Sequence, residues 1–326
     1  MAQPIKHNVV ALDSWVKPPP FEIDHDLFLH NTTDPTEIAS LVKDATIIIV
    51  SMVPVSRATI EAAPNLQLVA CNGTGTDHVD KVAARQHGVA VCHVPAQNTE
   101  SVSEHAFALF FALRRQILPM HTLTIDGGIW SKNNAIYQKM GAPPRTNGEE
   151  TLVLVGYGAI GKAVERIGRA LGMQVLIAER KGVIEVRPGR TFFEEALKRG
   201  TLFILVVPLD DTTRNMFGKK EFDAMQPTAL VVNVGRGGVT NEQDLVDALK
   251  SGKLAGAATD VFEIEPATKE NCRLLDSSVP NLLLSPHVAW YSSRTIEGTL
   301  AAIKSNIEGF ANGKPQNIVV PSKNTA

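Results

Sequence analysis

The 326-residue sequence has few cysteines, little net charge and no long apolar run, and each shortage excludes a class of protein. The cysteines Cys71, Cys92 and Cys272 are widely spaced and form no CxxC pattern, so we expect neither a disulfide framework nor a zinc site. A formal net charge of −2 gives no basic field for nucleic acid or acidic membranes. No segment reaches the roughly eighteen apolar residues of a membrane span. These shortages predict a cytoplasmic globular protein that binds no metal, nucleic acid or membrane.

Short apolar runs alternate with helical patterns over nearly the whole chain, which is typical of parallel sheets built from βαβ units. The length favours two domains, and the first fifteen residues show no signal peptide. In the first third, the predicted strands are 47–50, 66–70 and 89–94, with a helix before Gly88. From Thr151 the alternation is more regular and predicts strands at 151–155, 174–178, 202–207, 229–234, 255–260 and 282–285.

The segment GYGAIG follows the strand expected at 151–155 and opens a helix, and this context gives the common glycine pattern its meaning. Gly156 permits the sharp turn, Gly158 lets backbone N–H groups approach a pyrophosphate, and Gly161 lets helix and strand pack closely. The positive end of the helix dipole would face the phosphates. We therefore predict a dinucleotide site that also includes Ala159 and Ile160.

Glu179 ends the next predicted strand, where an acid can accept hydrogen bonds from the adenosine ribose and repel a 2′-phosphate. This position favours NAD over NADP. Arg180 and Lys181 follow directly, however, so NADP stays open as the alternative. Cofactor contacts are expected at Arg180 and at the ends of later strands, at Pro208, Thr213, Val234, Gly235 and Asp260.

Arg236, Glu265 and His287 each follow a predicted strand, and the carboxyl ends of parallel strands share one edge of a sheet. Alone, Arg236 could be a surface residue and Glu265 an acid that precedes Pro266. Together they suit dehydrogenation. A guanidinium can grip a substrate carboxylate, a histidine can protonate a carbonyl oxygen, and a carboxylate can orient that histidine. The three residues therefore predict a reductase of 2-keto acids.

Three segments carry a resemblance to a known family: LVGYGAIGKAVERIGRALGMQV, VVNVGRGGVTNEQDLVDALKSGKLAGAATDVFEIEP and NLLLSPHVAW. In this order they resemble the D-isomer-specific 2-hydroxyacid dehydrogenases over nearly the full length. The resemblance implies that Arg236, Glu265 and His287 are catalytic, and that Asp260 lies near the nicotinamide carboxamide.

The segment CNGTGTDHVD resembles the substrate loop of the same family. The resemblance implies that the backbone amides of Thr74 and Gly75 bind the substrate carboxylate.

The resemblance also implies an α/β fold of two doubly wound parallel-sheet domains, Rossmann- or flavodoxin-like, with a cleft between them. Residues 1–100 and 291–326 would form the substrate domain, and residues 101–290 the dinucleotide-binding domain. Crossover helices are expected near 101–118 and 291–310. The stretch 120–148 is similar to the arm through which such proteins dimerise, so a homodimer is expected.

The segment HVAW, His-x-Ala-Trp, resembles glycerate dehydrogenases that reduce hydroxypyruvate, and it is also similar to C-terminal-binding-protein corepressors. We expect NAD(H)-dependent reduction of hydroxypyruvate or glyoxylate to the D-2-hydroxy acid, with Trp290 lining the substrate pocket. The alternative for Trp290 is packing at the domain hinge. The alternative function is an NAD-binding corepressor, against which the short segment after the last helix counts. Formate dehydrogenase does not need Glu265, and the length disfavours phosphoglycerate dehydrogenase with a regulatory module.

Overall fold

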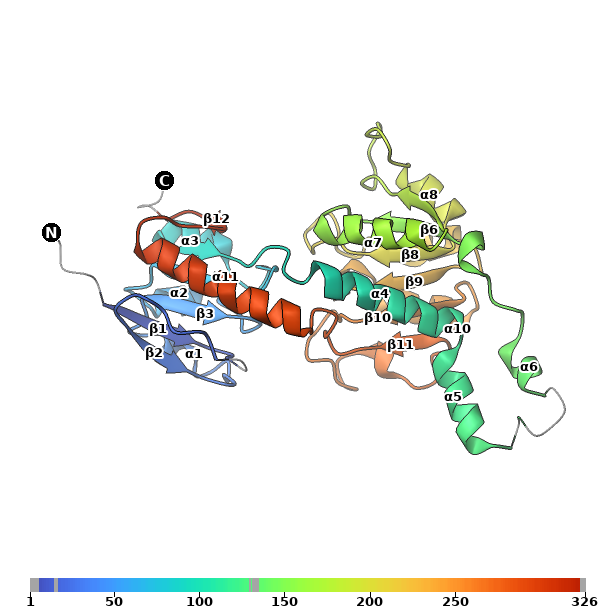
Figure 1. Ribbon diagram of the computed structural model, residues 1–326, viewed down its shortest axis with the longest axis horizontal. Coiled ribbons are helices and arrows are strands. Elements are labelled where there is room, and N and C mark those ends of the chain that lie inside the picture. The colour runs from blue at the N-terminus through green and yellow to red at the C-terminus, as the bar shows by residue number, and fades with distance from the viewer. Residues whose placement is uncertain (1–5, 15–16, 129, 131–134, 323–326) are drawn as a thin grey trace. The chain divides into compact units, whose positions relative to one another are not determined.

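The structure is a computed structural model that describes residues 6–14, 17–128, 130 and 135–322. The chain divides into two compact units, one of Met1–Asn98 with Tyr291–Ala326 and one of Thr99–Trp290. Each unit has its own sheet and its own buried core (Figure 1). Among the described helices, none is long and apolar enough to cross a membrane.

The first unit contains one six-stranded sheet. Its strands are β1 (His7–Ala11), β2 (His25–Leu29), β3 (Ile47–Val50), β4 (Leu68–Cys71), β5 (Ala90–Cys92) and β12 (Ile318–Val320). They lie in the order β12-β5-β4-β3-β1-β2. The pairs among β1 to β5 are parallel, and β12 runs antiparallel to β5 at one edge. The carboxyl ends of the five parallel strands therefore share one edge of the sheet.

Helices cover both faces of this sheet, because alternate strand residues point to opposite sides. The helices are α1 (Ile38–Leu41), α2 (Arg57–Glu61), α3 (Lys81–His87) and α11 (Ser293–Ala311). On one face, Val10 and Ile48 belong to a buried cluster with Ile60 of α2. On the other, Ile47 packs in a cluster with Ile303 of α11. Helix α3 ends at Gly88 as predicted, in a left-handed conformation with φ +74°.

The second unit contains a six-stranded sheet in which every pair is parallel. Its strands are β6 (Thr151–Val155), β7 (Gln174–Ile177), β8 (Leu202–Leu205), β9 (Leu230–Asn233), β10 (Gly256–Thr259) and β11 (Leu282–Leu284). The order β11-β10-β9-β8-β6-β7 places β6 between β7 and β8, so the winding direction reverses beside β6. In such sheets, ligands bind outside the carboxyl ends of the strands at that reversal. The predicted α/β fold class with two parallel-sheet domains is confirmed.

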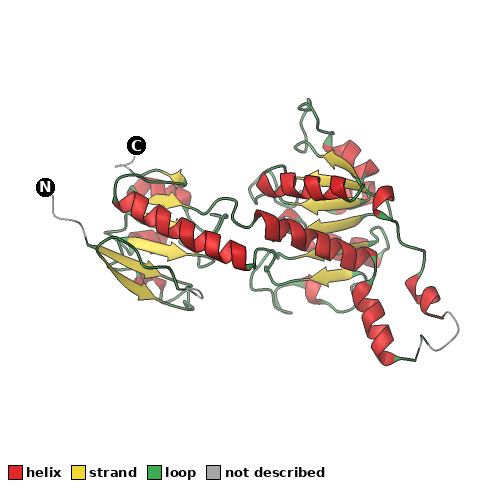
Figure 2. Cartoon of the chain, in the orientation of Figure 1, coloured by secondary structure: helices red, strands yellow, loops and turns green. Residues whose placement is uncertain are grey.

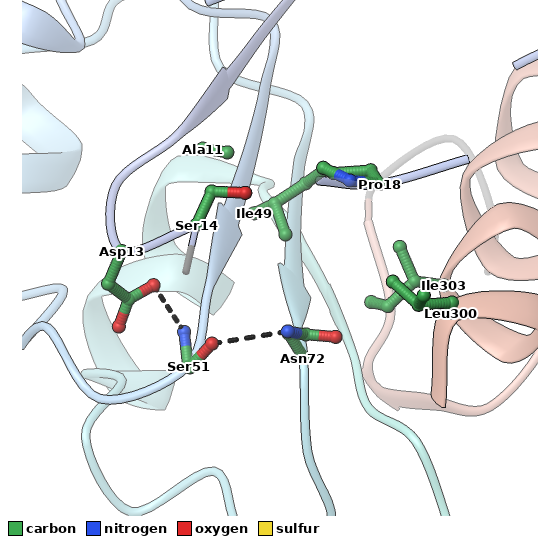
Figure 3. A pocket seen from close by; sticks show the side chains of 9 residues that line it. All are labelled: Ala11, Asp13, Ser14, Pro18, Ile49, Ser51, Asn72, Leu300 and Ile303. Carbon is green, nitrogen blue, oxygen red and sulfur yellow. Dashed lines mark hydrogen bonds between the residues drawn. The ribbon is translucent and has the colours of Figure 1, made fainter. Parts of the chain in front are cut away.

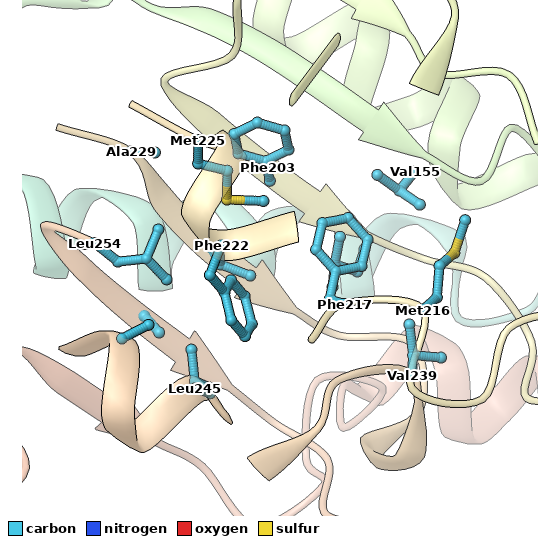
Figure 4. Packing of buried hydrophobic residues seen from close by; sticks show 14 of the residues in the cluster. Val155, Phe203, Met216, Phe217, Phe222, Met225, Ala229, Val239, Leu245 and Leu254 are labelled. Carbon is cyan, nitrogen blue, oxygen red and sulfur yellow. The ribbon is translucent and has the colours of Figure 1, made fainter. Parts of the chain in front are cut away.

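The described part of the second unit has seven α-helices, and those that pack on its sheet cover both faces (Figure 2). They are α4 (Thr99–Arg114), α5 (Ile117–Asp126), α6 (Ala135–Met140), α7 (Ala159–Ala170), α8 (Phe193–Arg199), α9 (Lys219–Ala224) and α10 (Glu242–Lys250), with short 3₁₀ helices η1 (Asn147–Glu149), η2 (Gly237–Val239) and η3 (Arg273–Leu275). Residues of α4 and α7 pack on one face, and residues of α8, α9 and α10 on the other. Figure 4 shows Phe203 of β8 beside Phe217, with ring centroids 6.4 Å apart, and Phe222 of α9 close by.

Two local features differ from the sequence-based prediction. The expected crossover helix 101–118 is broken, because α4 ends at Arg114 and Gln116 adopts φ +51° before α5 begins. Strands β1, β2 and β12 were not predicted, and β12 departs from an all-parallel sheet. The predicted arm, 120–148, includes residues 129 and 131–134, which lie outside the described residues.

Candidate active site

The glycine-rich turn after β6 has the geometry that a pyrophosphate requires. Gly156 adopts φ +102°, and a Cβ there would lie 2.9 Å from the Val206 carbonyl. A Cβ on Gly161 would lie 2.4 Å from the Gly156 carbonyl oxygen, so this glycine lets α7 approach the strand. Gly158 precedes α7, and among the described residues nothing lies within 4 Å of where its Cβ would be. The residues therefore fit a dinucleotide phosphate, which could approach the N–H groups of the first turn, including Ala159 and Ile160.

Four other predicted cofactor residues lie in the loops that follow β8 and β9. The Thr213 hydroxyl donates a hydrogen bond to the Pro208 carbonyl oxygen at 2.7 Å. Val234 is buried, and its N–H donates to Leu205 at 3.2 Å. A Cβ on Gly235 would lie 2.9 Å from the carbonyl oxygen of residue 207. The loops after β8 and β9 are thus packed together at the carboxyl edge, next to the glycine-rich turn.

The predicted acid–base pair is formed, because Nδ1 of His287 lies 2.6 Å from Oε2 of Glu265. The other carboxylate oxygen accepts the N–H of Phe262 at 2.9 Å. Burial acts to raise the pKa of Glu265, but the hydrogen bond and charge of His287, the Phe262 N–H and the charge of Arg236 outweigh it and lower the pKa below its usual value. Glu265 is therefore ionised at neutral pH and accepts a proton-bearing Nδ1, which leaves Nε2 of His287 as the nitrogen that can exchange a proton.

Asp260, at the end of β10, holds the loop that carries His287. Its Oδ1 accepts hydrogen bonds from the Ser285 hydroxyl at 2.6 Å and the Val288 N–H at 3.0 Å, and its Oδ2 accepts from the Ala289 N–H at 2.8 Å. Its backbone carbonyl accepts the His287 N–H at 2.7 Å. His287 adopts φ +55°, which is uncommon for a residue other than glycine. The carboxyl group that was expected near the nicotinamide carboxamide is therefore engaged in shaping the histidine loop.

Arg236 lies between β9 and η2, in a loop that Asn233 fixes from within. Asn233 Nδ2 donates to the Arg236 carbonyl at 2.8 Å, and Asn233 Oδ1 accepts the Gly235 N–H at 3.1 Å. A Cβ on Gly237 would lie 1.9 Å from the carbonyl carbon of Phe262, so only glycine fits there. The backbone of the loop that carries Arg236 therefore contacts the backbone of the loop that carries Glu265.

Glu179 differs from its predicted role, because its carboxylate is already engaged within the protein. Oε2 accepts the Arg187 Nε–H at 2.7 Å and Oε1 accepts the Arg180 N–H at 2.9 Å, and a second guanidinium N–H of Arg187 also bonds Oε1. The side chain of Arg187 holds the pKa of Glu179 down to about 2, against the desolvation of the buried carboxyl. The acid expected to receive the ribose hydroxyls is 4% exposed and paired with an arginine.

Thr74 and Gly75 belong to the other compact unit, in the loop that follows β4. The Thr74 hydroxyl donates to the Val94 carbonyl at 2.9 Å, and the Thr74 carbonyl lies 2.9 Å from Nδ1 of His93. At the start of this loop, Asn72 lines a small hollow with Asp13, Ser14, Ser51 and Leu300 (Figure 3). Asn72 Nδ2 donates to the Ser51 hydroxyl at 3.2 Å, and Asp13 accepts the Ser51 N–H at 2.8 Å. The loop is thus anchored on both sides at the carboxyl edge of its own sheet.

Four residues that support the site were missed by sequence reasoning. They are His105, Ser285, Glu242 and Arg187. Nε2 of His105, from α4, lies 3.0 Å from the Ser285 hydroxyl that donates to Asp260. Glu242 is buried at 9% exposure and accepts the Glu263 N–H at 2.8 Å. Position at a strand end could have identified Ser285, but no pattern connects the other three to their partners.

The three cysteines are free and buried. Within the described part of the chain, no group of three or more histidine, cysteine, aspartate or glutamate side chains is placed to hold a metal ion.

The glycine-rich turn at the reversal of a doubly wound parallel sheet, beside the Arg–Glu–His set, defines a dinucleotide-dependent oxidoreductase. The sequence profile described as "D-isomer specific 2-hydroxyacid dehydrogenase, NAD binding domain" matches residues 107–289. The chain belongs to the D-isomer-specific 2-hydroxyacid dehydrogenase family. The predicted family, enzyme class and nicotinamide cofactor are therefore confirmed.

Several relatives are similar over nearly the whole chain. The glycerate dehydrogenase of Methylorubrum extorquens is 35% identical over 310 residues, which cover 95% of this chain and 96% of the relative. The hydroxypyruvate reductase of Blautia hydrogenotrophica is 31% identical, with 88% of each chain covered. A similar solved structure is that of the NADPH-dependent glyoxylate/hydroxypyruvate reductase of Sinorhizobium meliloti in complex with NADP and malonate. The TM-score is 0.77 and the sequence identity is 27%, with 98% of this chain and 97% of that chain covered.

Replacing Asp260 by Asn should loosen the loop that carries His287, because an amide N–H₂ would face one of the N–H groups now bound. Leaving one buried donor unpaired costs about 1–3 kcal/mol of unfolding free energy. Displacement of the histidine by about 1 Å should lower kcat by roughly 100-fold. Urea unfolding and steady-state kinetics measure the two effects. Ser285→Ala removes only one of these hydrogen bonds and should cost about 1 kcal/mol. Wild-type stability and kcat in Asp260→Asn would contradict the loop-holding role.

Proposed function

We propose that this enzyme reduces a small 2-keto acid, hydroxypyruvate or glyoxylate, to the D-2-hydroxy acid, with His287 as the general acid. The observation that carries this proposal is the 2.6 Å contact between His287 and Glu265 at the carboxyl edge of the nucleotide-binding sheet. The names of the relatives in Methylorubrum and Blautia support the substrate class. In this proposal Met1–Asn98 with Tyr291–Ala326 is the substrate domain and Thr99–Trp290 the dinucleotide domain.

The glycine-rich turn with Gly156, Gly158 and Gly161 would hold a reduced nicotinamide dinucleotide, which would supply a hydride for the keto carbon. His287 delivers the proton from Nε2 to the carbonyl oxygen, since Nδ1 is held by Glu265. Loss of the proton leaves a neutral imidazole that is re-protonated from solvent before the next turnover. The carboxylate of Glu265 stabilises the protonated ring and fixes its orientation. Run in the opposite direction, the same nitrogen accepts the hydroxyl proton.

Arg236 binds the substrate carboxylate in this proposal, since its planar guanidinium suits bidentate contact with a carboxylate. Its loop is rigid, because Asn233 bonds two backbone groups within it. Backbone N–H groups of Thr74 and Gly75 add further donors to the same carboxylate. Their loop is anchored through the Thr74 hydroxyl and carbonyl, which supports a fixed binding geometry.

The corepressor alternative predicts dinucleotide binding without effective turnover. The ionised Glu265 beside His287 favours an enzyme, because a binding protein has no need of a positioned acid–base pair. The three free, buried thiols support the predicted cytoplasmic location.

Replacement of His287 by Asn should lower kcat for keto-acid reduction by roughly two to four orders of magnitude, the range for a lost general acid. Asparagine tolerates the positive φ at this position, so the loop should keep its shape. The dissociation constant for the reduced dinucleotide, from fluorescence titration, should change less than about twofold. His87→Ala, an exposed histidine in the other unit, is the control. Turnover close to wild type in His287→Asn would remove the histidine from the mechanism.

Trp290 is proposed to wall the substrate pocket, because its indole N–H donates to the His287 carbonyl at 2.8 Å and fixes the ring near the proton donor. Hydroxypyruvate and glyoxylate should then exceed phenylpyruvate in kcat/KM, by about 10–200-fold for each methylene that does not fit. Trp290→Ala should shift the ratio toward bulkier acids. Trp290→Phe loses the N–H but keeps an aromatic wall, so it should preserve the ranking. A wild-type preference for phenylpyruvate that Trp290→Ala leaves unchanged would reject this assignment.

We also propose that the arm within 120–148, with the adjacent start of α5, joins two copies into a homodimer. Helix α5 has no buried residue, and apolar side chains of this region are exposed: Ile117 51%, Leu118 54%, Ile125 72%, Trp130 67% and Tyr137 65%. Several large apolar side chains exposed within one segment favour a protein interface. A second copy is the occupant that the family resemblance indicates.

Light scattering should give wild-type protein a mass of twice 35.2 kDa, and Ile125→Glu should shift it toward the monomer because a charge would be buried in the interface. The matched control is Ile184→Glu, since Ile184 is 94% exposed elsewhere in the same unit and should leave the mass unchanged. A monomeric wild type, or a dimer indifferent to Ile125→Glu at micromolar concentration, would count against the arm.

A further inference from the structure

The loop after β7 gathers arginines around one buried carboxylate. β7 is the second strand of the nucleotide-binding unit, and in such folds its end faces the adenosine ribose. An acid free to accept hydrogen bonds there binds the ribose 2′-hydroxyl, while a nearby arginine accommodates a 2′-phosphate. The state of Glu179 therefore decides which dinucleotide the site prefers, and any such preference rests on the dinucleotide site of the proposed function.

The carboxylate of Glu179 has no acceptor position left for a ribose. Arg187 donates from Nε and Nη2 to the two oxygens, and the backbone N–H groups of Arg180 and Arg187 add hydrogen bonds of 2.9 and 3.3 Å. Arg190 Nε lies 3.9 Å from Oε2. With the side chain 4% exposed, these groups enclose a fully ionised acid. Its negative charge is matched locally and cannot act on a ligand as an isolated charge would.

Arg187 keeps donors that point away from Glu179. A guanidinium has five N–H groups, and the fork to Glu179 uses two of them. The Arg187 side chain is 56% exposed, and the side chain of Arg180 is exposed as well. Lys181 is directed elsewhere, to Glu221 at 2.9 Å and the Met216 carbonyl at 3.2 Å. The surface that remains at the end of β7 is therefore cationic.

The arginine loop is also tied to the glycine-rich turn. The guanidinium carbon of Arg190 lies 5.3 Å from the centre of the Tyr157 ring, and Tyr157 stands between Gly156 and Gly158. The Tyr157 hydroxyl is hydrogen-bonded to Glu165 of α7. The contact fixes the cationic loop next to the turn that fits the pyrophosphate, so one dinucleotide could reach both. The side chains of Arg187 and Arg190 contact Glu179, and the loop 180–190 holds three arginines and one lysine against a single further acid, Glu185.

We propose that Arg187 sequesters Glu179 and, with Arg180, forms a receptor for a 2′-phosphate, so that NADPH binds more tightly than NADH. Arg187 is then the specificity-determining residue and Glu179 the residue that positions it. The planar fork of arginine suits both partners, because one edge can pair with a carboxylate while the other meets a phosphate.

The test measures binding by isothermal titration calorimetry with the full chain, at about 0.15 M salt and without substrate. Adenosine 2′,5′-bisphosphate and 5′-AMP are the probes, because they differ only in the 2′-phosphate. The wild-type protein should bind the bisphosphate roughly 10- to 100-fold more tightly, the range for hydrogen bonds between charged groups. An equal or weaker affinity for the bisphosphate would overturn the proposal.

Substitutions separate sequestration from general electrostatics. We call the affinity for the bisphosphate divided by the affinity for 5′-AMP the affinity ratio. Arg187→Ala frees a carboxylate that repels phosphate, so the ratio should fall below one. Adding Glu179→Gln to this variant should restore the ratio to about one. Arg180→Ala leaves the Glu179–Arg187 fork intact and should lower the affinity ratio about tenfold. This variant tests the receptor independently if Arg187→Ala folds poorly. The control is Arg199→Ala, a surface arginine paired with Glu195, which should leave the ratio unchanged. A ratio that Arg187→Ala and Arg180→Ala leave unchanged would overturn the assignment.

The calorimetric result is distinguishable from a failure of the proposed function. Binding of NADH and 5′-AMP without any gain from the 2′-phosphate would refute the arginine receptor and leave keto-acid reduction standing. If the protein turned over no keto acid but strongly preferred the bisphosphate, the proposed reductase function would be wrong and the arginine receptor would still hold.

Discussion

A buried carboxyl group at the end of β10 sets the backbone geometry on which the position of His287 depends. The side chain of Asp260 is 1% exposed, and taking a carboxyl group out of water costs several kcal/mol unless hydrogen bonds replace its hydration. The replacement comes from one hydroxyl and two consecutive backbone N–H groups, those of Ser285, Val288 and Ala289. Because those donors flank position 287, satisfying the acid fixes the backbone of the histidine, including its positive φ. The hydrogen bonds that stabilise the buried Asp260 carboxylate are therefore the same ones that position His287.

The second unit was predictable strand by strand, and the reason is burial. A parallel sheet covered on both faces needs continuous apolar runs, and runs such as TLVLV and LFIL stand out in any sequence. The Arg–Glu–His set followed from the same logic, since parallel strands deliver their carboxyl ends to one edge. Strand β2, HDLFL, is an edge strand in which no residue is buried, and β12 has three residues at the other edge, so neither has that signal. The break at Gln116 rests on one left-handed residue that no propensity indicates.

The role of Glu179 could not be inferred from its position alone, because its partner is not periodic with it. Arg187 lies in a loop without strand or helix, and only the folded path brings its guanidinium to the carboxylate. Glu265 makes an instructive contrast. Both carboxyl groups have a lowered pKa although burial acts to raise it. At Glu265 burial is the largest single effect, and His287, the Phe262 N–H and Arg236 outweigh it together, whereas at Glu179 the hydrogen bonds of Arg187 are the largest effect. One acid is paired with an imidazole, which can titrate near neutral pH, and the other with a guanidinium, which stays protonated.

The loops that carry Arg236 and Glu265 are joined by backbone contacts, so the positions of these two residues are not independent. The arginine loop presses Gly237 against the backbone of Phe262, with no room for a Cβ between them. The neighbouring N–H of Glu263 is held by the buried Glu242, whose second oxygen accepts a hydrogen bond from the Cys272 thiol at 3.4 Å. The N–H of Phe262 in turn donates to the carboxylate of Glu265, and this carboxylate contacts Nδ1 of His287. A shift in the loop after β9 therefore reaches the imidazole through two packed backbones. Substitution of Gly237 or Glu242 should therefore have effects similar to substitution of Glu265 or His287. Gly237 has no side chain, and the carboxylate of Glu242 binds Glu263 and Cys272 instead.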